Sequence, residues 1–264
     1  LFKDKYLDDV GTFVLRRVNS LLVPYFLYNL FYLVVTIIVA KFTGKFWGMD
    51  ISLKNFFITP FLNGHQFDLS CPLWFVTQLF MTLMVFLFLF RGLKKIKDSR
   101  YFHLIVFGLV GVSAIPLSKV ISMTPIALVV IRTMFSLLFV YLGYYYRHFV
   151  EDKIDIFTPK WAGAVIVLQA ILWLFNRDYS PVQGIGLSYV LVWARFDQQL
   201  IVPIITAITG IWASLFVIKL LYPYIKDIKF LQLVGENTYH IMANHLLVMY
   251  ILTAFFLKIN GISI

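Results

Sequence analysis

Charged residues are scarce in this sequence: Asp, Glu, Lys and Arg make up only 14% of its 264 residues. Soluble domains carry about 25% charged and roughly 45–50% apolar residues, whereas this chain is 61% hydrophobic. A soluble fold has nowhere to put so much Phe, Leu, Ile and Val. The composition therefore excludes a soluble domain and indicates an integral membrane protein.

Other features are missing as well. The single cysteine, Cys71, excludes an intramolecular disulfide. The motifs G-x-x-x-x-G-K-[ST], G-x-G-x-x-G and H-E-x-x-H do not occur, so nucleotide hydrolysis and zinc proteolysis have no support, and we expect no metal site. The net charge of +10 does not indicate nucleic acid, because the basic residues lie at the ends of apolar segments, where they set membrane topology.

Seven long apolar stretches fill the chain. About twenty consecutive apolar residues cross the hydrocarbon core as a helix, and we predict spans near Val18–Phe42, Pro72–Phe90, Phe102–Leu117, Pro125–Tyr146, Trp161–Phe175, Leu200–Tyr222 and Thr238–Leu257. The third and fifth are short. We therefore predict an all-α, polytopic transmembrane helix bundle of about seven spans, with residues 1–264 forming a single integral-membrane domain in a lipid bilayer.

The Lys and Arg residues between the spans orient the chain. One side of the predicted membrane holds 14 of them and the other side holds 7. Cytoplasmic loops carry the excess, so we predict that the N-terminus of this chain is cytoplasmic. Two long connections, Thr43–Cys71 and Asn176–Gln199, are then external, and the apolar segment Gly184–Ala194 is expected to be re-entrant or interfacial.

Arg132 lies well inside the fourth predicted span. An arginine at the bilayer centre costs about 2.5–3.5 kcal/mol on insertion scales, so such residues face the protein interior or a wet cavity. Its guanidinium suits a phosphate, a carboxylate or an acyl carbonyl. The alternative is a structural bond to helix carbonyls, and the sequence leaves both open.

The last predicted span carries a second group of polar residues. Asn237, His240 and Asn244 share one helix face, and His245 lies on the neighbouring stripe with Thr238. Histidine acts as a general base or relays protons near neutral pH. Polar residues in membrane helices also form helix-to-helix hydrogen bonds. His245 lies deeper in the span than His240.

Four blocks of sequence, in order, resemble a known family, the acyltransferase 3 family of bacterial membrane O-acyltransferases. The blocks match its basic helix start, its "LWFL" helix, its glycine-bearing middle helix and its late "SYxIYLxH" helix; they are Phe13–Tyr25, Pro72–Val76, Phe139–Tyr144 and Gly235–His245. The resemblance covers nearly the whole chain, and its sugar and polysaccharide O-acetyltransferases are the members most similar to it.

The resemblance implies about ten helices in an intact member, and this chain is expected to correspond to the third through ninth. It would then lack two helices in front and one behind, and with them the family's catalytic histidine on the first helix. In the family's basic RxxR element, Arg17 matches the first arginine, but Ser20 stands where the second would be.

Residue roles follow from the resemblance. Arg16 and Arg17 are expected to bind the phosphates of a CoA donor. The alternative is that they only anchor the cytoplasmic end of the helix and set its topology. Trp74 is expected to line a sugar-binding cavity or to anchor at the membrane interface. The predicted catalytic residues are His245, expected to contribute to the central cavity, and Arg132 as oxyanion donor, while the family's histidine base is missing from this chain. His240 and Asn244 are expected to bind the acceptor substrate.

The predicted function is acyl transfer in the bacterial inner membrane. An acetyl or other short acyl group would move from acetyl-CoA, or another acyl-CoA, to a hydroxyl of a sugar or cell-envelope polysaccharide, with no bound cofactor and no nucleic-acid partner. A non-enzymatic carrier or exporter of a glycan would use similar spans and an internal arginine, and a scaffold subunit is the third alternative. An enzyme leaves an ester on its acceptor, whereas a carrier does not.

Overall fold

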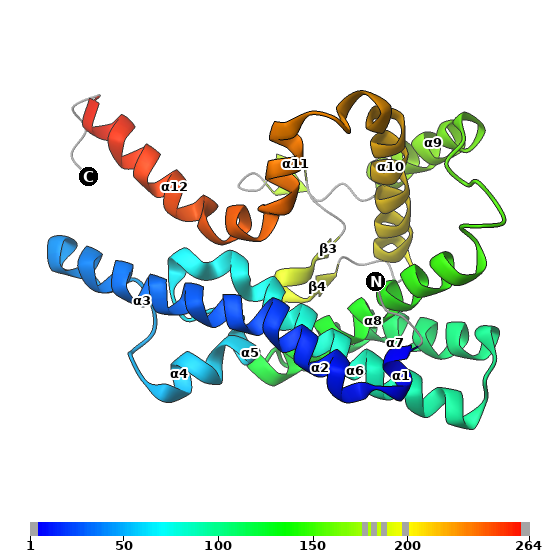
Figure 1. Ribbon diagram of the computed structural model, residues 1–264, viewed down its shortest axis with the longest axis horizontal. Coiled ribbons are helices and arrows are strands. Elements are labelled where there is room, and N and C mark those ends of the chain that lie inside the picture. The colour runs from blue at the N-terminus through cyan, green and yellow to red at the C-terminus, as the bar shows by residue number, and fades with distance from the viewer. Residues whose placement is uncertain (1–4, 176–178, 181–183, 186–188, 197–200, 260–264) are drawn as a thin grey trace. The chain divides into compact units, whose positions relative to one another are not determined.

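A computed structural model describes residues 5–175, 179–180, 184–185, 189–196 and 201–259 of the chain (Figure 1). The described part of the chain is predominantly helical, which confirms the all-α prediction. In chain order the helices are α1 (Lys5–Asp8), α2 (Val10–Arg17), η1 (Val18–Leu22), α3 (Val23–Thr43), α4 (Leu53–Phe57), α5 (Thr59–Asn63), η2 (Asp68–Leu73), α6 (Trp74–Ile96), α7 (Arg100–Val120), α8 (Pro125–Phe149), α9 (Pro159–Phe175), η3 (Leu191–Trp193), α10 (Val202–Ile225), α11 (Lys229–Glu236) and α12 (Thr238–Ile259).

Among the described residues, six helical runs are long and apolar enough to cross a membrane: Val10–Thr43, Asp68–Ile96, Arg100–Val120, Pro125–Phe149, Val202–Ile225 and Thr238–Phe256. The fifth predicted span is helix α9, which has 17 residues and is shorter than the other six. The protein is therefore a multi-pass membrane protein, and each of the seven predicted segments contains a helix. Leu200, where we expected the sixth span to begin, lies outside the described residues.

The two long connections differ from simple loops. The first contains the short helices α4 and α5 and the 3₁₀ helix η2. In the second, β1 (Tyr179–Ser180) pairs with β2 (Gly184–Ile185), and β3 (Tyr189–Val190) pairs with β4 (Arg195–Phe196), both antiparallel. The expectation of a re-entrant or interfacial segment falls partly on residues 186–188, outside the described residues, and stays a prediction.

The chain divides into two compact units. Unit 1 comprises Leu1–Asp8 and Thr82–Asp227, and unit 2 comprises Asp9–Met81 and Ile228–Ile264. Helix α6 contributes residues to both. Each unit has its own packed core, and each is described below by itself.

Unit 1 is built on helices α7 and α8, which lie side by side (Figure 1). Their apolar faces bury Ala114, Ile131 and Phe135, and Phe196 of β4 joins the same cluster. The Tyr141 hydroxyl on α8 donates to the backbone carbonyl of Arg100 at the start of α7, 2.9 Å away. The rigid pair that results carries Arg132 on α8.

Unit 2 is built on α3 and α12, with η2 packed between them in sequence and space. Pro24 is the second residue of α3, and Gly44 ends the helix in the left-handed conformation. The π-helix η1 joins α2 to α3 without a break. Tyr25 of α3, Leu73 of η2 and Ala243 of α12 are fully buried in one cluster.

Candidate functional site

A polar stripe runs along one face of α3. Tyr25, Asn29, Tyr32 and Thr36 are spaced four, three and four residues apart, which places them on one side of an α-helix. All four are 0% exposed, whereas the rest of the helix is mostly apolar. Polar groups kept on one buried face of a membrane-spanning helix need partners inside the protein.

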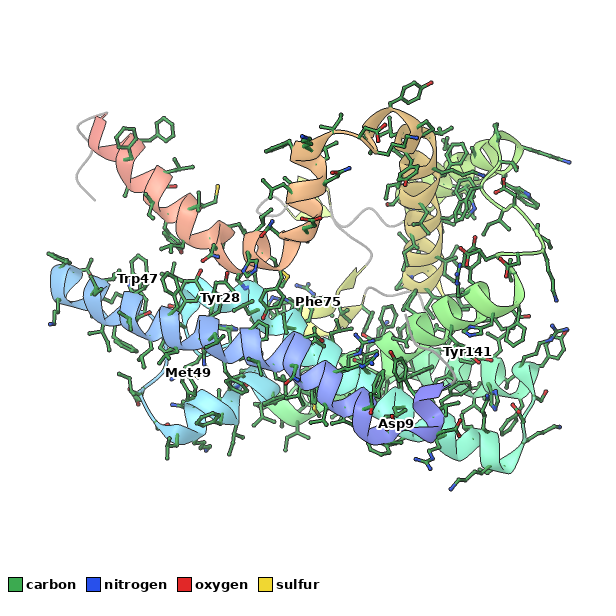
Figure 2. The ribbon with its side chains drawn as sticks, in the orientation of Figure 1. Asp9, Tyr28, Trp47, Met49, Phe75 and Tyr141 are labelled. Carbon is green, nitrogen blue, oxygen red and sulfur yellow. The ribbon has the colours of Figure 1, made fainter. Side chains whose placement is uncertain are left out.

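Helix α12 supplies partners for Tyr32 of this stripe and for Tyr28, which lies beside the stripe. The Tyr28 hydroxyl lies 2.6 Å from Nδ1 of His240 and accepts a hydrogen bond from Nδ2 of Asn244 at 3.2 Å. The Tyr32 hydroxyl donates to the carbonyl of Ala243 at 2.6 Å and lies 3.3 Å from Oδ1 of Asn244. We call these four side chains, Tyr28, Tyr32, His240 and Asn244, the α3–α12 network; Figure 2 labels Tyr28 on α3.

Several buried polar atoms around the network have no hydrogen-bond partner among the described residues. They are the hydroxyls of Tyr25 and Tyr239, Oδ1 of Asn29 and Nε2 of Gln66. Nδ2 of Asn29 does donate to Oε1 of Gln66, at 3.3 Å. Buried polar groups are almost always hydrogen-bonded in native proteins, so unit 2 retains hydrogen-bonding capacity for water or for the hydroxyls of a ligand.

The hydrogen bond of His245 fixes its tautomer. Its Nδ1 lies 2.9 Å from the backbone carbonyl of Met242. Because a carbonyl only accepts, Nδ1 must carry the proton, and Nε2 of the neutral ring is left with a free lone pair. The side chain is exposed in unit 2. His245 therefore has the form that a general base requires.

His240 is different, because its partner is a hydroxyl. The Tyr28 hydroxyl can donate to Nδ1 of His240 or accept from it, so both tautomers fit the geometry. The two rings also lie 5.8 Å apart between centroids. His240 is thus held in place by Tyr28, with its second ring nitrogen directed away from that bond.

Trp74 begins α6, and its position depends on Gly64. Gly64 ends α5 with a φ of +94°, and a Cβ added there would clash with the Cβ of Trp74. The hydroxyl of Thr77 also donates to the carbonyl of Pro60 at 3.1 Å. The start of α6 is therefore fixed tightly against the end of α5, and Trp74 is partly buried.

Arg16 and Arg17 lie in the last turn of α2. Arg16 is exposed, and the guanidinium of Arg17 lies over the Phe13 ring, 5.1 Å from its centroid. This contact holds Arg17 against its own helix through a cation–π interaction. The two arginines precede η1, which separates them from the polar stripe on α3.

Arg132 lies in unit 1, and its guanidinium is bound to backbone. Nε donates to the carbonyl of Leu191 at 3.3 Å, and an NH2 group donates to the carbonyl of Val192. The residue is 2% exposed. Arg132 thus fastens η3 to α8, which is the structural interpretation that the sequence left open; its role in catalysis stays a prediction.

Of the residues predicted from sequence, the structure brings His240 and Asn244 into one network. Sequence reasoning missed Tyr28, which contacts both of them, and Tyr32, which contacts Asn244. Polar residues of the first span do recur at helical spacing, but that spacing omits Tyr28 and does not identify the partners on α12. The role assigned to each site residue stays a prediction.

Comparison with known proteins places the chain in a chemical class. A family model described as an acyltransferase domain matches residues 1–263, which is nearly the whole chain. No curated protein and no solved structure matches the chain.

Proposed function

Because the chain belongs to the acyltransferase 3 family and is a membrane acyltransferase, we propose that it moves an acetyl or other short acyl group from acyl-CoA to a sugar hydroxyl. The acceptor is a sugar or polysaccharide of the bacterial cell envelope. The chain is assigned to the inner membrane, with its N-terminus on the cytoplasmic side.

The observation that carries the residue assignment is the tautomer of His245. With Nδ1 held by the carbonyl of Met242, Nε2 accepts the proton of the acceptor hydroxyl. The hydroxyl oxygen then attacks the thioester carbonyl, a C–O ester bond forms and the C–S bond breaks. The CoA thiolate leaves and takes up a proton, which regenerates the neutral histidine.

Acceptor binding is assigned to the α3–α12 network and to Trp74. His240 and Asn244 present hydrogen-bonding groups that Tyr28 holds in position. The hydroxyls of Tyr25 and Tyr239, which have no hydrogen-bond partner among the described residues, add further polar groups on the same two helices. A polyhydroxylic acceptor fits such a lining, because every hydroxyl both donates and accepts, and an indole offers an apolar face to a sugar ring.

The phosphates of the CoA donor and the oxyanion that forms during transfer both need positively charged side chains to bind them. Arg16 and Arg17 are assigned to the phosphates of the CoA donor, because guanidiniums bind phosphate by charge and geometry. Arg132 is assigned to the oxyanion of the tetrahedral intermediate, with its two carbonyl contacts fixing the guanidinium plane.

The test follows radiolabelled acetyl from acetyl-CoA into the carbohydrate fraction of membranes that contain the protein. Transfer to a hydroxyl gives label that mild alkali releases as acetate, because the product is an ester. Free CoA must appear in equal amount, which a thiol reagent measures in the same samples. Label that is stable to alkali would indicate an amide product and contradict the assignment of a hydroxyl acceptor.

The control separates enzyme from carrier. Glycan export is measured in the same cells with the wild type and with His245→Gln. A variant that still exports glycan but no longer forms the ester supports transfer as the function of the chain. Undiminished ester formation by membranes without the protein, or export lost with no change in ester content, would favour the carrier.

A further inference from the structure

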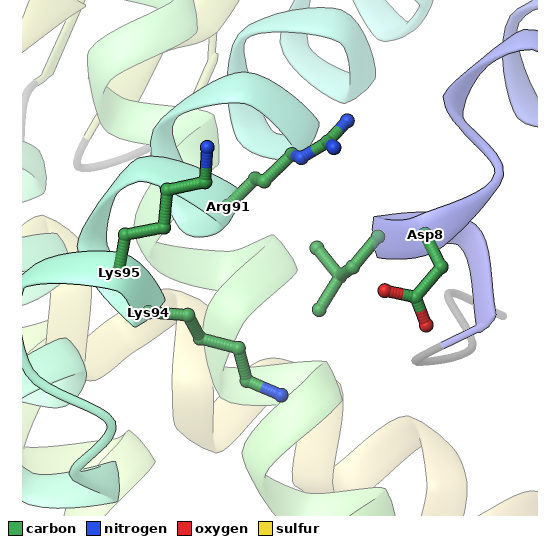
Figure 3. A pocket seen from close by; sticks show the side chains of 5 residues that line it. Asp8, Arg91, Lys94 and Lys95 are labelled. Atoms are coloured by element: carbon green, nitrogen blue, oxygen red, sulfur yellow. The ribbon is translucent and has the colours of Figure 1, made fainter.

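Two cavities in unit 1 lie at the ends of long helices. The first is lined by Leu7, Asp8, Arg91, Lys94 and Lys95. Figure 3 shows Asp8 on α1 facing the turns of α6 that carry Arg91 and Lys94. Basic residues at the end of a transmembrane helix set its topology and interact favourably with the carboxyl end of the helix dipole. These effects account for the first cavity, and we assign no ligand to it.

The second cavity, which we call the α8–α10 cleft, has a volume of about 420 Å³. This volume lies within the range of about 300–1,000 Å³ typical of small-ligand sites. The cleft is formed by the carboxyl ends of α8 and α10 and by the connection that follows α8. Its lining residues are Tyr146, Glu151, Ile154, Asp155, Phe157, Leu215, Ile218, Lys219 and Tyr222.

The connection is fixed to α10 at two places. The indole N–H of Trp212 donates to the carbonyl of Ile156 at 3.1 Å, and Nζ of Lys219 donates to the carbonyl of Phe157 at 3.1 Å. The rings of Phe157 and Trp212 also lie 5.8 Å apart between centroids. Since Trp212 and Lys219 are about two turns apart on α10, the wall of the cleft is held along its length before any ligand binds.

The cleft carries charges of both signs, and each retains hydrogen-bonding capacity. Nζ of Lys219 donates to Asp155 and to the carbonyl of Phe157. An ammonium has three N–H groups, so one remains after these two acceptors among the described residues. Glu151 accepts from Arg147, and Asp155 also accepts from the backbone N–H of Phe157. Because a carboxylate has about four lone-pair sites, both can accept from a further donor without losing these bonds.

Aromatic rings complete the polar end of the cleft. The rings of Tyr146 and Phe157 lie 6.0 Å apart between centroids, and Tyr222 is exposed. The faces of aromatic rings attract cations. Carboxylates beside ring faces therefore favour an ammonium group, whereas Lys219 favours a phosphate. The two preferences stand side by side in one cleft.

An apolar face of α10 leads away from the cleft. Helices α8 and α10 are both long enough to cross a membrane, and their ends lie where lipid headgroups lie. Ile211, Leu215, Ile218 and Tyr222 are all exposed, at spacings of four, three and four residues along α10. This spacing places them on one face, which extends over about 16 Å. An acyl chain can lie along it.

We propose that the α8–α10 cleft binds one phospholipid whose headgroup carries an ammonium beside its phosphate. The ammonium donates to Glu151 and Asp155, and the phosphate accepts from Lys219. Basic segments at a membrane surface usually attract anionic lipids. This cleft should discriminate against a purely anionic headgroup, because two carboxylates line it.

The experiment equilibrates the purified full chain in detergent with equal amounts of phosphatidylethanolamine and phosphatidylglycerol. Bound lipid is then measured by native mass spectrometry. The wild type should retain phosphatidylethanolamine at least about 5-fold better, because only its ammonium adds charge-assisted hydrogen bonds to the carboxylates. Preferential retention of phosphatidylglycerol by the wild type would overturn the proposal.

The test variant is Glu151→Gln/Asp155→Asn. Its matched control, Asp98→Asn/Asp152→Asn, removes two exposed carboxylates of unit 1 that do not line the cleft. Exposed ion pairs contribute little to stability, so both variants are expected to fold. The test variant should lose the preference for phosphatidylethanolamine, because Lys219 then lacks a carboxylate beside it, while the control stays within about 2-fold of the wild type. Equal behaviour of the two variants would contradict the proposal.

A second variant leaves every charge in place. Tyr222→Leu removes one ring face from the lining, and Tyr224→Leu, two residues further along α10, is the control because Tyr224 does not line the cleft. We expect retention of phosphatidylethanolamine to fall about 2–5-fold in the first variant only. No difference between them would remove the ring faces from the site. Lipid retention is measured without turnover, so neither outcome bears on the proposed acyl transfer.

Discussion

Arg132 in unit 1 and the α3–α12 network in unit 2 both place polar groups inside apolar helices, but they bind them differently. Arg132 donates to the carbonyls of Leu191 and Val192, so its charge fixes backbone. In unit 2, the Tyr25 and Tyr239 hydroxyls have no partner among the described residues, and Nε2 of His245 keeps its lone pair. A buried charge can therefore have a structural role as readily as a functional one. Buried polar atoms that still lack a hydrogen-bond partner are the better indication of a ligand site.

The largest effect should come from His245→Gln. Removing a general base costs about 10²–10⁴-fold in rate, so we expect acyl transfer to fall at least ~100-fold in the radiolabel assay. His148→Gln is the matched control, because the exposed His148 makes the same kind of bond, from Nδ1 to the carbonyl of Tyr144 at 2.9 Å. Equal activity of the two variants would remove His245 from the mechanism.

Arg132→Leu should affect structure and activity together. It leaves the carbonyls of Leu191 and Val192 without this donor, a loss of about 1–3 kcal/mol for a buried unsatisfied group. We expect faster hydrogen exchange around η3 and transfer lowered more than 10-fold, with membrane insertion intact. Arg132→Lys keeps the charge; if it restores η3 but not transfer, the guanidinium acts in catalysis as well, and normal transfer by the leucine variant contradicts that role.

Gly64→Ala tests how rigidly Trp74 must be held in unit 2. The substitution combines a positive φ with a clash against Trp74, and we expect about 1–3 kcal/mol of lost stability as a lower thermal midpoint in detergent. Gly44→Ala is the control, since Gly44 has a φ of +70° but nothing within 4 Å of the added Cβ. Equal losses in both variants would show that packing on Trp74 contributes nothing.

Tyr28→Phe should have a modest effect. It removes the hydroxyl that joins His240 to Asn244, and a hydrogen bond of this kind contributes about 0.5–1.5 kcal/mol. We expect the KM for the acceptor to rise several-fold with little change in kcat, because His245 is untouched. Tyr101→Phe, on the exposed surface of α7 in unit 1, is the control. A fall in kcat with an unchanged KM would instead indicate that Tyr28 acts in the chemical step and not in acceptor binding.

The smallest effect concerns an exposed ion pair of unit 1. Nζ of Lys219 donates to Oδ2 of Asp155 at 2.5 Å and holds the pKa of that carboxyl below its usual value of 3.8. A lowered folded pKa gives stability that is present above the unfolded pKa and lost as the pH falls through the folded pKa. The thermal midpoints of wild type and Asp155→Asn should therefore differ slightly at about pH 6 and converge only as the pH falls below 3.8 and through the lowered folded pKa. A constant difference would exclude this pair as the cause.

Much of the fold could be predicted from sequence, because helix length and hydropathy are local properties. The spans predicted from Pro125 and Thr238 begin at the same residues as helices α8 and α12, and they end three and two residues earlier than those helices. The helices inside Thr43–Cys71 were missed, since short helices such as α4 depend on packing more than on periodicity.

The candidate site was predicted less completely, for a physical reason. His240 and Asn244 were identified because they interrupt an apolar span. Tyr28 and Tyr32 escaped, because a tyrosine is amphipathic and looks like any aromatic residue until its hydroxyl has a partner. That partner lies 212 residues away for both the Tyr28–His240 and the Tyr32–Asn244 contact, so only the fold reveals it.

The π-helix η1, Val18–Leu22, determines how the side chains of α2 are rotated about the helix axis relative to those of α3. A π turn holds one residue more than the α-helix that it interrupts, and each residue advances an α-helix by about 100°. Deleting a single codon, for Asn19, would therefore swing Arg16 and Arg17 about a quarter turn around the axis relative to the stripe that begins at Tyr25. An insertion or deletion of one residue in η1 can thus change the direction in which Arg16 and Arg17 point, without a substitution on α2 or α3.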